Sequence, residues 1–94
     1  MNNEIARALL TTILAEYRGR RYGELTALVG HHEVRALRGP DGKDYQIELQ
    51  TEWDDQPAGS VRVLAAIDDG GLRAFVPLCD DFIVRPDGTV VGEP

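Results

Sequence analysis

The chain has 94 residues, enough for one domain with a modest hydrophobic core. Its 10 basic and 16 acidic side chains give a net charge of −6, which argues against a nucleic-acid backbone as the main partner. The single cysteine, Cys79, excludes an internal disulfide. No stretch approaches the roughly 20 apolar residues of a membrane helix. We therefore expect a soluble protein of the cytoplasm, with neither membrane nor nucleic acid among its partners.

The acidic residues are concentrated in the second half of the chain. Residues 1–43 have seven basic and five acidic side chains, whereas residues 44–94 have three basic and eleven acidic ones. A strongly acidic half favours cations or a basic protein as binding partner. Lys43 is the only lysine, so nearly all basic residues are arginine, which suggests a GC-rich bacterial genome.

Two helices are predicted at the start of the chain. Apolar residues recur at helical spacing over residues 3–18, with Asn2 as a candidate N-cap and Gly19 as the stop. We interpret this apolar stripe as the face that packs on a sheet. Residues 22–29 also have helical spacing and end at Gly30, although their β-favouring side chains leave a strand open.

Four strands are predicted after the helices. The clearest covers residues 43–53, where apolar and polar side chains alternate strictly, as expected for one buried and one wet face. The turn at residues 39–42, Gly-Pro-Asp-Gly, separates it from an outer strand at residues 33–38. Two apolar strands at residues 61–67 and 72–78 follow. Short connections between consecutive strands predict an antiparallel meander.

The two apolar strands are predicted to form the central hairpin, with a tight turn at residues 68–71, Asp-Asp-Gly-Gly. Pro77 cannot donate to a sheet, so the second strand should be irregular or at an edge there. Residues 82–84 are a short apolar piece. A turn at residues 86–88 would let residues 89–91 pair back as a minimal hairpin.

These elements predict one α+β domain over residues 1–94, with an N-terminal helix or helix pair packed on one face of a four- to five-stranded antiparallel meander sheet. We expect the other face of the sheet to be polar and open to solvent or to a second chain. The side chains expected on that face are Gln46, Glu48, Gln50, Glu52, Arg62 and Arg73.

Three Asp-Asp pairs are the constellation with the clearest functional potential. On a meander, Asp54-Asp55 and Asp80-Asp81 lie at one end of the sheet, and Asp68-Asp69 lies at the other. Aspartate ordinarily caps strand ends and turns, and this is the main interpretation. The alternatives are a cation site or a partner-binding acidic rim. The rim would consist of Asp54, Asp55, Asp80 and Asp81.

A shared cation site meets two obstacles. The strands that carry Asp54-Asp55 and Asp80-Asp81 flank one intervening strand, which places them about 10 Å apart. Adjacent histidines such as His31-His32 point to opposite faces of an extended segment, so they should not share one ion. Cys79 precedes two acids, which opposes a reactive thiolate. We therefore expect no cofactor and no metal.

Two function classes follow from the sequence. The first is a small acidic non-enzymatic interaction module, an adaptor or inhibitor of a basic protein partner, with a homodimer left open. The second is a small cation-binding protein or hydrolase that uses the Asp pairs with His31 or His32. The first class needs only surface charge, whereas the second needs a converging site that the strand spacing does not deliver.

Overall fold

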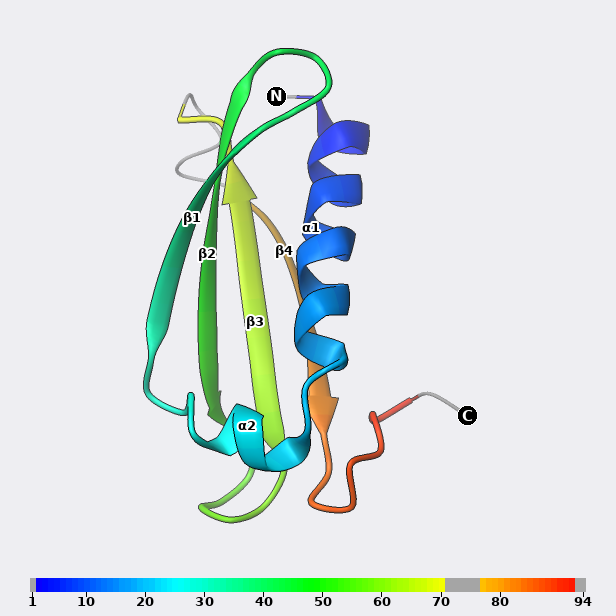
Figure 1. Cartoon of the computed structure of the whole chain (residues 1–94), viewed down its shortest axis with the longest axis vertical. Helices are drawn as coiled ribbons and strands as arrows, with labels where there is room; N and C mark the ends of the chain where they lie inside the picture. The colour runs from blue at the N-terminus through cyan, green and yellow to red at the C-terminus, as the bar shows by residue number, and fades with distance from the viewer. Residues whose placement is uncertain (1, 71–76, 93–94) are drawn as a thin grey trace.

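The computed structural model describes residues 2–70 and 77–92, which form a two-layer α+β arrangement (Figure 1). Helix α1 (Asn3–Arg18) lies along one face of a four-stranded antiparallel sheet with the strand order β1-β2-β3-β4, as predicted. The strands are β1 (His32–Arg38), β2 (Asp44–Trp53), β3 (Val61–Asp68) and β4 (Leu78–Val84). Neither described helix is long and apolar enough to cross a membrane.

Helix α1 has the predicted boundaries because both ends carry suitable capping residues. The side chain of Asn2 accepts a hydrogen bond from the backbone N–H of Ile5 at 3.1 Å. At the other end, the backbone N–H of Gly19 donates to the carbonyl of Ala15. The face toward the sheet buries apolar side chains, each large one contributing roughly 1.5–3 kcal/mol. These buried residues are Ala6, Leu10, Ile13, Leu14 and Tyr17.

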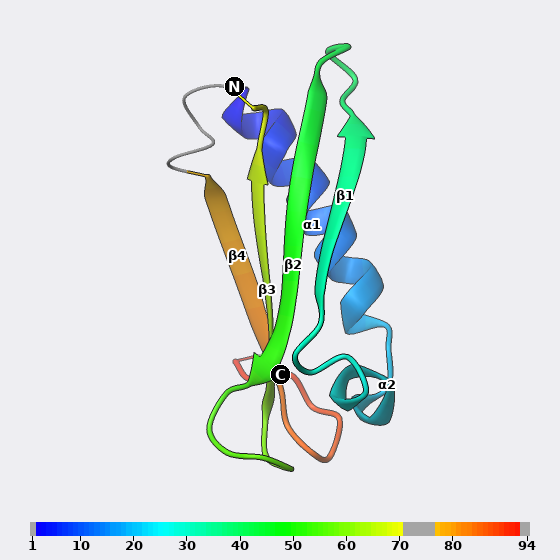
Figure 2. The same ribbon diagram turned by 90° about the vertical axis from the view of Figure 1, so that its left-hand side faces the viewer.

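A second short helix, α2 (Tyr22–Thr26), lies near the end of α1 and on the same side of the sheet (Figures 1 and 2). It begins where the backbone N–H of Arg21 donates to the Glu24 carboxylate at 3.1 Å. Leu25 is fully buried and fixes the helix to the core. The predicted helix is therefore confirmed but shorter, and the chain reaches Gly30, with φ of 87°, through turns.

The central strands β2 and β3 supply most of the sheet's contribution to the core. The register pairs Leu49 of β2 with Ala65 of β3, and both side chains face the helices. The predicted orientation of β2 is confirmed. The core residues of these two strands are Tyr45, Ile47, Leu49, Thr51, Val61, Val63, Ala65 and Ile67.

The opposite side of the sheet is covered by neither helix, and we call it the open face (Figure 2). Strand alternation and the pairing registers assign its side chains. They are His32, Val34, Ala36 and Arg38 of β1; Asp44, Gln46, Glu48, Gln50 and Glu52 of β2; Arg62, Leu64, Ala66 and Asp68 of β3; and Cys79, Asp81 and Ile83 of β4. Five of the six residues predicted for this face are among them, and Arg73 lies outside the described residues.

The fourth strand lies further along the chain than predicted. Ile67 pairs with Leu78, so the partner of β3 is β4 and not a strand that ends at residue 78. Gly70 has the positive φ expected of a turn, 81°, whereas residues 71–76 of the predicted hairpin lie outside the described residues. The apolar piece at residues 82–84 is the part of β4 nearest the core. Its pairing with the following segment, through a bridge between Val84 and Val90, is confirmed.

The turn between β1 and β2 packs closely on Tyr45, which leads to a first prediction. A Cβ atom on Gly39 would lie 2.7 Å from Cε2 of Tyr45 and 2.6 Å from Oδ1 of Asp41. Gly39→Ala should therefore lower the free energy of unfolding by about 1–3 kcal/mol through overpacking, as measured by urea denaturation. Gly23→Ala is the control, because its added Cβ would meet nothing within 4 Å. Equal stabilities for the two variants would contradict the prediction.

Candidate functional site

Arg62 brings together one member of each of two predicted Asp pairs on the open face. Its Nη2 lies 2.7 Å from Oδ1 of Asp54, and its Nη1 lies 2.8 Å from Oδ2 of Asp81. Asp54 follows β2 and Asp81 belongs to β4, so Arg62 on the intervening strand bridges the gap between them. The hydrogen bonds that Arg62 donates to Asp54, the chief cause, and the nearby carboxylates of Asp81 and Glu52 raise the pKa of Arg62. Three carboxylates around one guanidinium leave a local excess of two negative charges.

The other members of these two Asp pairs serve local backbone structure. Oδ1 of Asp55 accepts hydrogen bonds from the backbone N–H groups of Gln56 and Ser60, at 2.7 and 3.0 Å, and so shapes the loop after β2. Asp80 lies on the helix side of β4, opposite Ala65. The expectation that Asp80-Asp81 lies with Asp54-Asp55 at one end of the sheet is therefore wrong, since both residues lie within β4 and pair with Ala65 and Leu64 of β3. A partner-binding role for Asp54, Asp55, Asp80 and Asp81 stays a prediction.

The third Asp pair and its neighbours are placed at the opposite end of the sheet, as the meander predicts. Oδ1 of Asp68 accepts a hydrogen bond from the backbone N–H of Gly70 at 2.8 Å. Desolvation works against ionisation of Asp41, but hydrogen bonds from the Tyr45 hydroxyl and the Lys43 backbone N–H lower its pKa. These aspartates thus have the turn-capping role that the sequence favoured.

A hollow of about 170 Å³ lies on the open face beside Asp81. Leu64 and Ala66 line its apolar part, and Glu48 and Gln50 line its polar part. The register places Leu64, one of its lining residues, directly opposite Asp81 of the Arg62 cluster. Small-molecule sites usually measure about 300–1,000 Å³. This hollow therefore has the size for a single side chain of a partner and not for a cofactor.

The open face as a whole has an excess of negative charge. It carries the carboxylates of Asp44, Glu48, Glu52, Asp68 and Asp81, against the guanidinium groups of Arg38 and Arg62. Arg38 lies 3.2 Å from Asp44 at the end of the face away from Asp54. The other four carboxylates, those of Glu48, Glu52, Asp68 and Asp81, are then balanced by the single guanidinium group of Arg62.

The two histidines are separate from the Arg62 cluster. Nε2 of His32 lies 3.6 Å from Oε2 of Glu48 on the open face, while His31 precedes β1. His32 and Asp81 occupy the same row of the sheet with two strands between them, a span of about 14 Å. Within residues 2–70 and 77–92, no three His, Cys, Asp or Glu side chains form a group that could hold a metal ion.

A polar network between α1 and β1 was not foreseen from the sequence. The Tyr17 hydroxyl donates a short hydrogen bond to Glu33, and Arg35 lies 2.7 Å from Glu33 and 2.8 Å from Glu16. Burial, and then the hydrogen bond with Glu33, raise the pKa of Tyr17. Hydrogen bonds from Tyr17 and then Arg35 lower the pKa of Glu33. The sequence feature that could have indicated this network is the pair of charged residues at positions 33 and 35. They share one face of a strand whose apolar residues, 34 and 36, lie on the other face.

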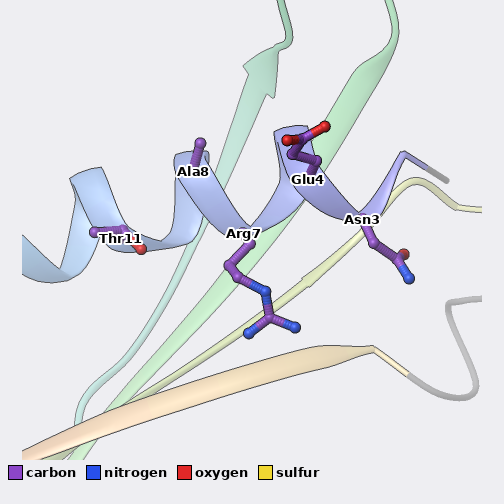
Figure 3. Close-up of a pocket in the computed structure, with 5 residues that line it drawn as sticks. All are labelled: Asn3, Glu4, Arg7, Ala8 and Thr11. Atoms are coloured by element: carbon purple, nitrogen blue, oxygen red, sulfur yellow. The ribbon is translucent and has the colours of Figure 1, made fainter.

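A second depression lies on the outer surface of α1, lined by Asn3, Glu4, Arg7, Ala8 and Thr11. Figure 3 shows the Glu4 and Arg7 side chains pointing away from each other across the helix. Their charged groups therefore do not converge on a common point. This surface has the character of a solvated helix face, and the open face of the sheet remains the stronger candidate.

Comparisons of the chain with protein-family models, curated proteins and solved structures found no match.

Proposed function

We propose that this chain is a small acidic, non-enzymatic interaction module that binds a basic protein through its open face. The observation that carries the proposal is the hollow with Leu64 and Ala66 on its apolar side and Glu48 on its polar side. Lysine and arginine have an apolar stem and a charged head. One such side chain of the partner can place its stem on Leu64 and Ala66 and its head against Glu48.

The surrounding charges support the same kind of partner. The negative field of the open face attracts a basic surface and raises its association rate. Arg62 holds Asp54 and Asp81 in fixed positions, which lowers the entropy that binding must remove from them. An adaptor or an inhibitor of a basic protein would use the face in this way. The single cysteine and the preference for arginine over lysine support the further proposal that it acts in the cytoplasm of a bacterium.

Two substitutions test the two halves of the hollow separately. Glu48→Gln removes the negative charge that lines the hollow, and Ala66→Leu fills the hollow without any change of charge. We expect Glu48→Gln to slow association with the captured basic partner and Ala66→Leu to speed its dissociation, each weakening binding by about tenfold. Affinity capture followed by surface plasmon resonance at low and high salt measures both rates.

Glu4→Gln is the charge-matched control, because Glu4 lies on the solvent-exposed side of α1, away from the open face. The control should bind the partner as tightly as the wild type does. Equally tight binding by both Glu48→Gln and Ala66→Leu would refute the proposal. The cation-binding or hydrolase alternative makes a different prediction. Calcium, magnesium or zinc would then raise the melting temperature, and the double variant Asp54→Asn/Asp81→Asn would lose that shift.

A further inference from the structure

We propose that two copies of this chain pair through the outer edges of β1 in an antiparallel register centred on Val34. The strand order places β1 at one end of the sheet, and within the described part of the chain no strand pairs with its outer edge. Pairing of two such edges would join two four-stranded sheets into one of eight strands. This interface uses the outer edge of β1 and leaves the hollow at Leu64 and Ala66 free, so it does not depend on the basic partner proposed above.

The two edges of the sheet differ in how well they are guarded against such pairing. The β4 edge carries Asp80 and Asp81, whose like charges oppose addition of another acidic copy. The segment after β4 also folds back on it, through the bridge between Val84 and Val90. Strand β1 carries one carboxylate and two guanidinium groups in an otherwise acidic chain, so it is the edge at which two copies repel least.

The order of side chains along β1 selects the register. Centring the two-fold axis on Val34 places Glu33 opposite Arg35 of the second copy, and this pair occurs twice. Centring it on Glu33 or on Arg35 would instead place like charges directly opposite each other, which is unfavourable. Val34 is 52% exposed, the most exposed large hydrophobic side chain of the described residues, and this register buries it against its own copy.

The existing contacts of Glu33 and Arg35 are compatible with this arrangement. Both side chains lie on the helix side of β1, where Nε and Nη1 of Arg35 bind Glu33 and Glu16. These two contacts use two of the five N–H donors of a guanidinium group. The two-fold axis would run perpendicular to the sheet, so both α1 helices would lie on one side and both open faces on the other.

Cysteine cross-linking in a Cys79→Ser background tests the register. Val34→Cys should give a covalent dimer with an oxidant or a short bismaleimide, because the paired Cβ atoms would be about 5 Å apart. Ala36→Cys is the control on the same face of the same strand. Residue 36 and its copy would be about 14 Å apart, so this variant should not form a disulfide. A mixture of the His32→Cys and Ala36→Cys proteins should cross-link as a heterodimer.

Light scattering after size-exclusion chromatography tests the dimer itself. We expect wild-type protein to show twice the 10.4 kDa chain mass, and Val34→Lys to raise the dissociation constant about tenfold or more, since two ammonium groups would face each other. The fold should tolerate this lysine, which lies opposite Glu48. Val91→Lys, at another exposed valine, should leave the dimer unchanged. A monomeric wild type at every concentration, or equal disulfide yields at positions 34 and 36, would overturn the proposal.

Discussion

Replacement of Ile67 by aspartate should abolish the folded protein, whereas Ala66→Asp should leave it folded. Ile67 is fully buried on the helix side of β3, and the adjacent Ala66 faces the opposite way, onto the open face. A buried carboxylate without a partner costs several kcal/mol, out of the roughly 5–15 kcal/mol that stabilises a small domain. Soluble yield and thermal melting by circular dichroism measure the difference.

Ala65→Asp extends the same test to a position closer to the helix. Ala65 is 2% exposed and lies opposite Leu49 in the core, so its aspartate variant should also fail to fold. The sequence alone could not decide which of these β3 residues faces inward, and the register now assigns both Ala65 and Ile67 to the core. Near-wild-type melting of either core variant would show that the register is wrong.

Truncation of Tyr17 should produce the second large effect, because this side chain joins α1 to β1. Its ring is 2% exposed and lies 4.4 Å from the guanidinium carbon of Arg20. Tyr17→Ala should lower the free energy of unfolding by about 3–5 kcal/mol, as for other buried aromatic residues. Tyr17→Phe removes only the hydroxyl bond to Glu33 and should cost about 1–2 kcal/mol. Equal losses in the two variants by urea denaturation would contradict a packing role for the ring.

The same network predicts how stability depends on pH. The pKa of Tyr17 is raised in the folded state, so its contribution is complete below the ordinary tyrosine pKa of about 10 and is lost as pH rises through the higher folded value. The pKa of Glu33 is lowered, so its contribution is complete above about pH 4.3 and is lost as pH falls through the lower folded value.

Tyr17→Phe should weaken the pH dependence of stability on both sides, because it removes the ionisable hydroxyl and with it the hydrogen bond that is the chief cause of the lowered pKa of Glu33. The phenylalanine cannot ionise, so the variant should lose less stability than the wild type between neutral and strongly alkaline pH. Tyr45→Phe should remove a further part of the alkaline loss, since burial and the hydrogen bond to Asp41 raise the pKa of Tyr45 as well. Urea denaturation at a series of pH values measures the loss of stability at acid and at alkaline pH. An alkaline loss that is unchanged in both variants would show that Tyr17 and Tyr45 do not cause it.

Local patterns in the sequence were sufficient where one strand or helix determines its own burial. The strict alternation in β2 identified its core face because every second side chain is apolar or threonine over ten residues. The stripe and caps of α1 defined both its limits and its buried side for the same reason. The meander order then followed from short connections between consecutive strands.

Features that depend on contacts between distant residues could not be derived in this way. Asp80 and Asp81 have low strand propensity, which made residues 78–84 look unlike a strand. Asp81 is accommodated there by Arg62, a residue of the neighbouring strand. The Arg62 cluster was missed for the same reason. The distance of about 10 Å between the strands that carry the two Asp pairs was considered without the arginine of the strand between them. In β1, Glu33, Arg35 and Leu37 face the helix, where Glu33 bonds to Tyr17 and Leu37 packs against the core, while Val34 faces away.

The packing of α1 on β3 and β4 has a consequence for synthesis of the protein. The helix is made first, but β4, which it contacts, ends at Val84. At about 5–20 residues per second, the ribosome needs roughly 3–13 s to make the residues between Arg18 and Val84. During that interval the strands on which Leu10, Ile13 and Leu14 pack are still incomplete. The nascent chain should therefore be most prone to aggregation before β4 emerges from the ribosome.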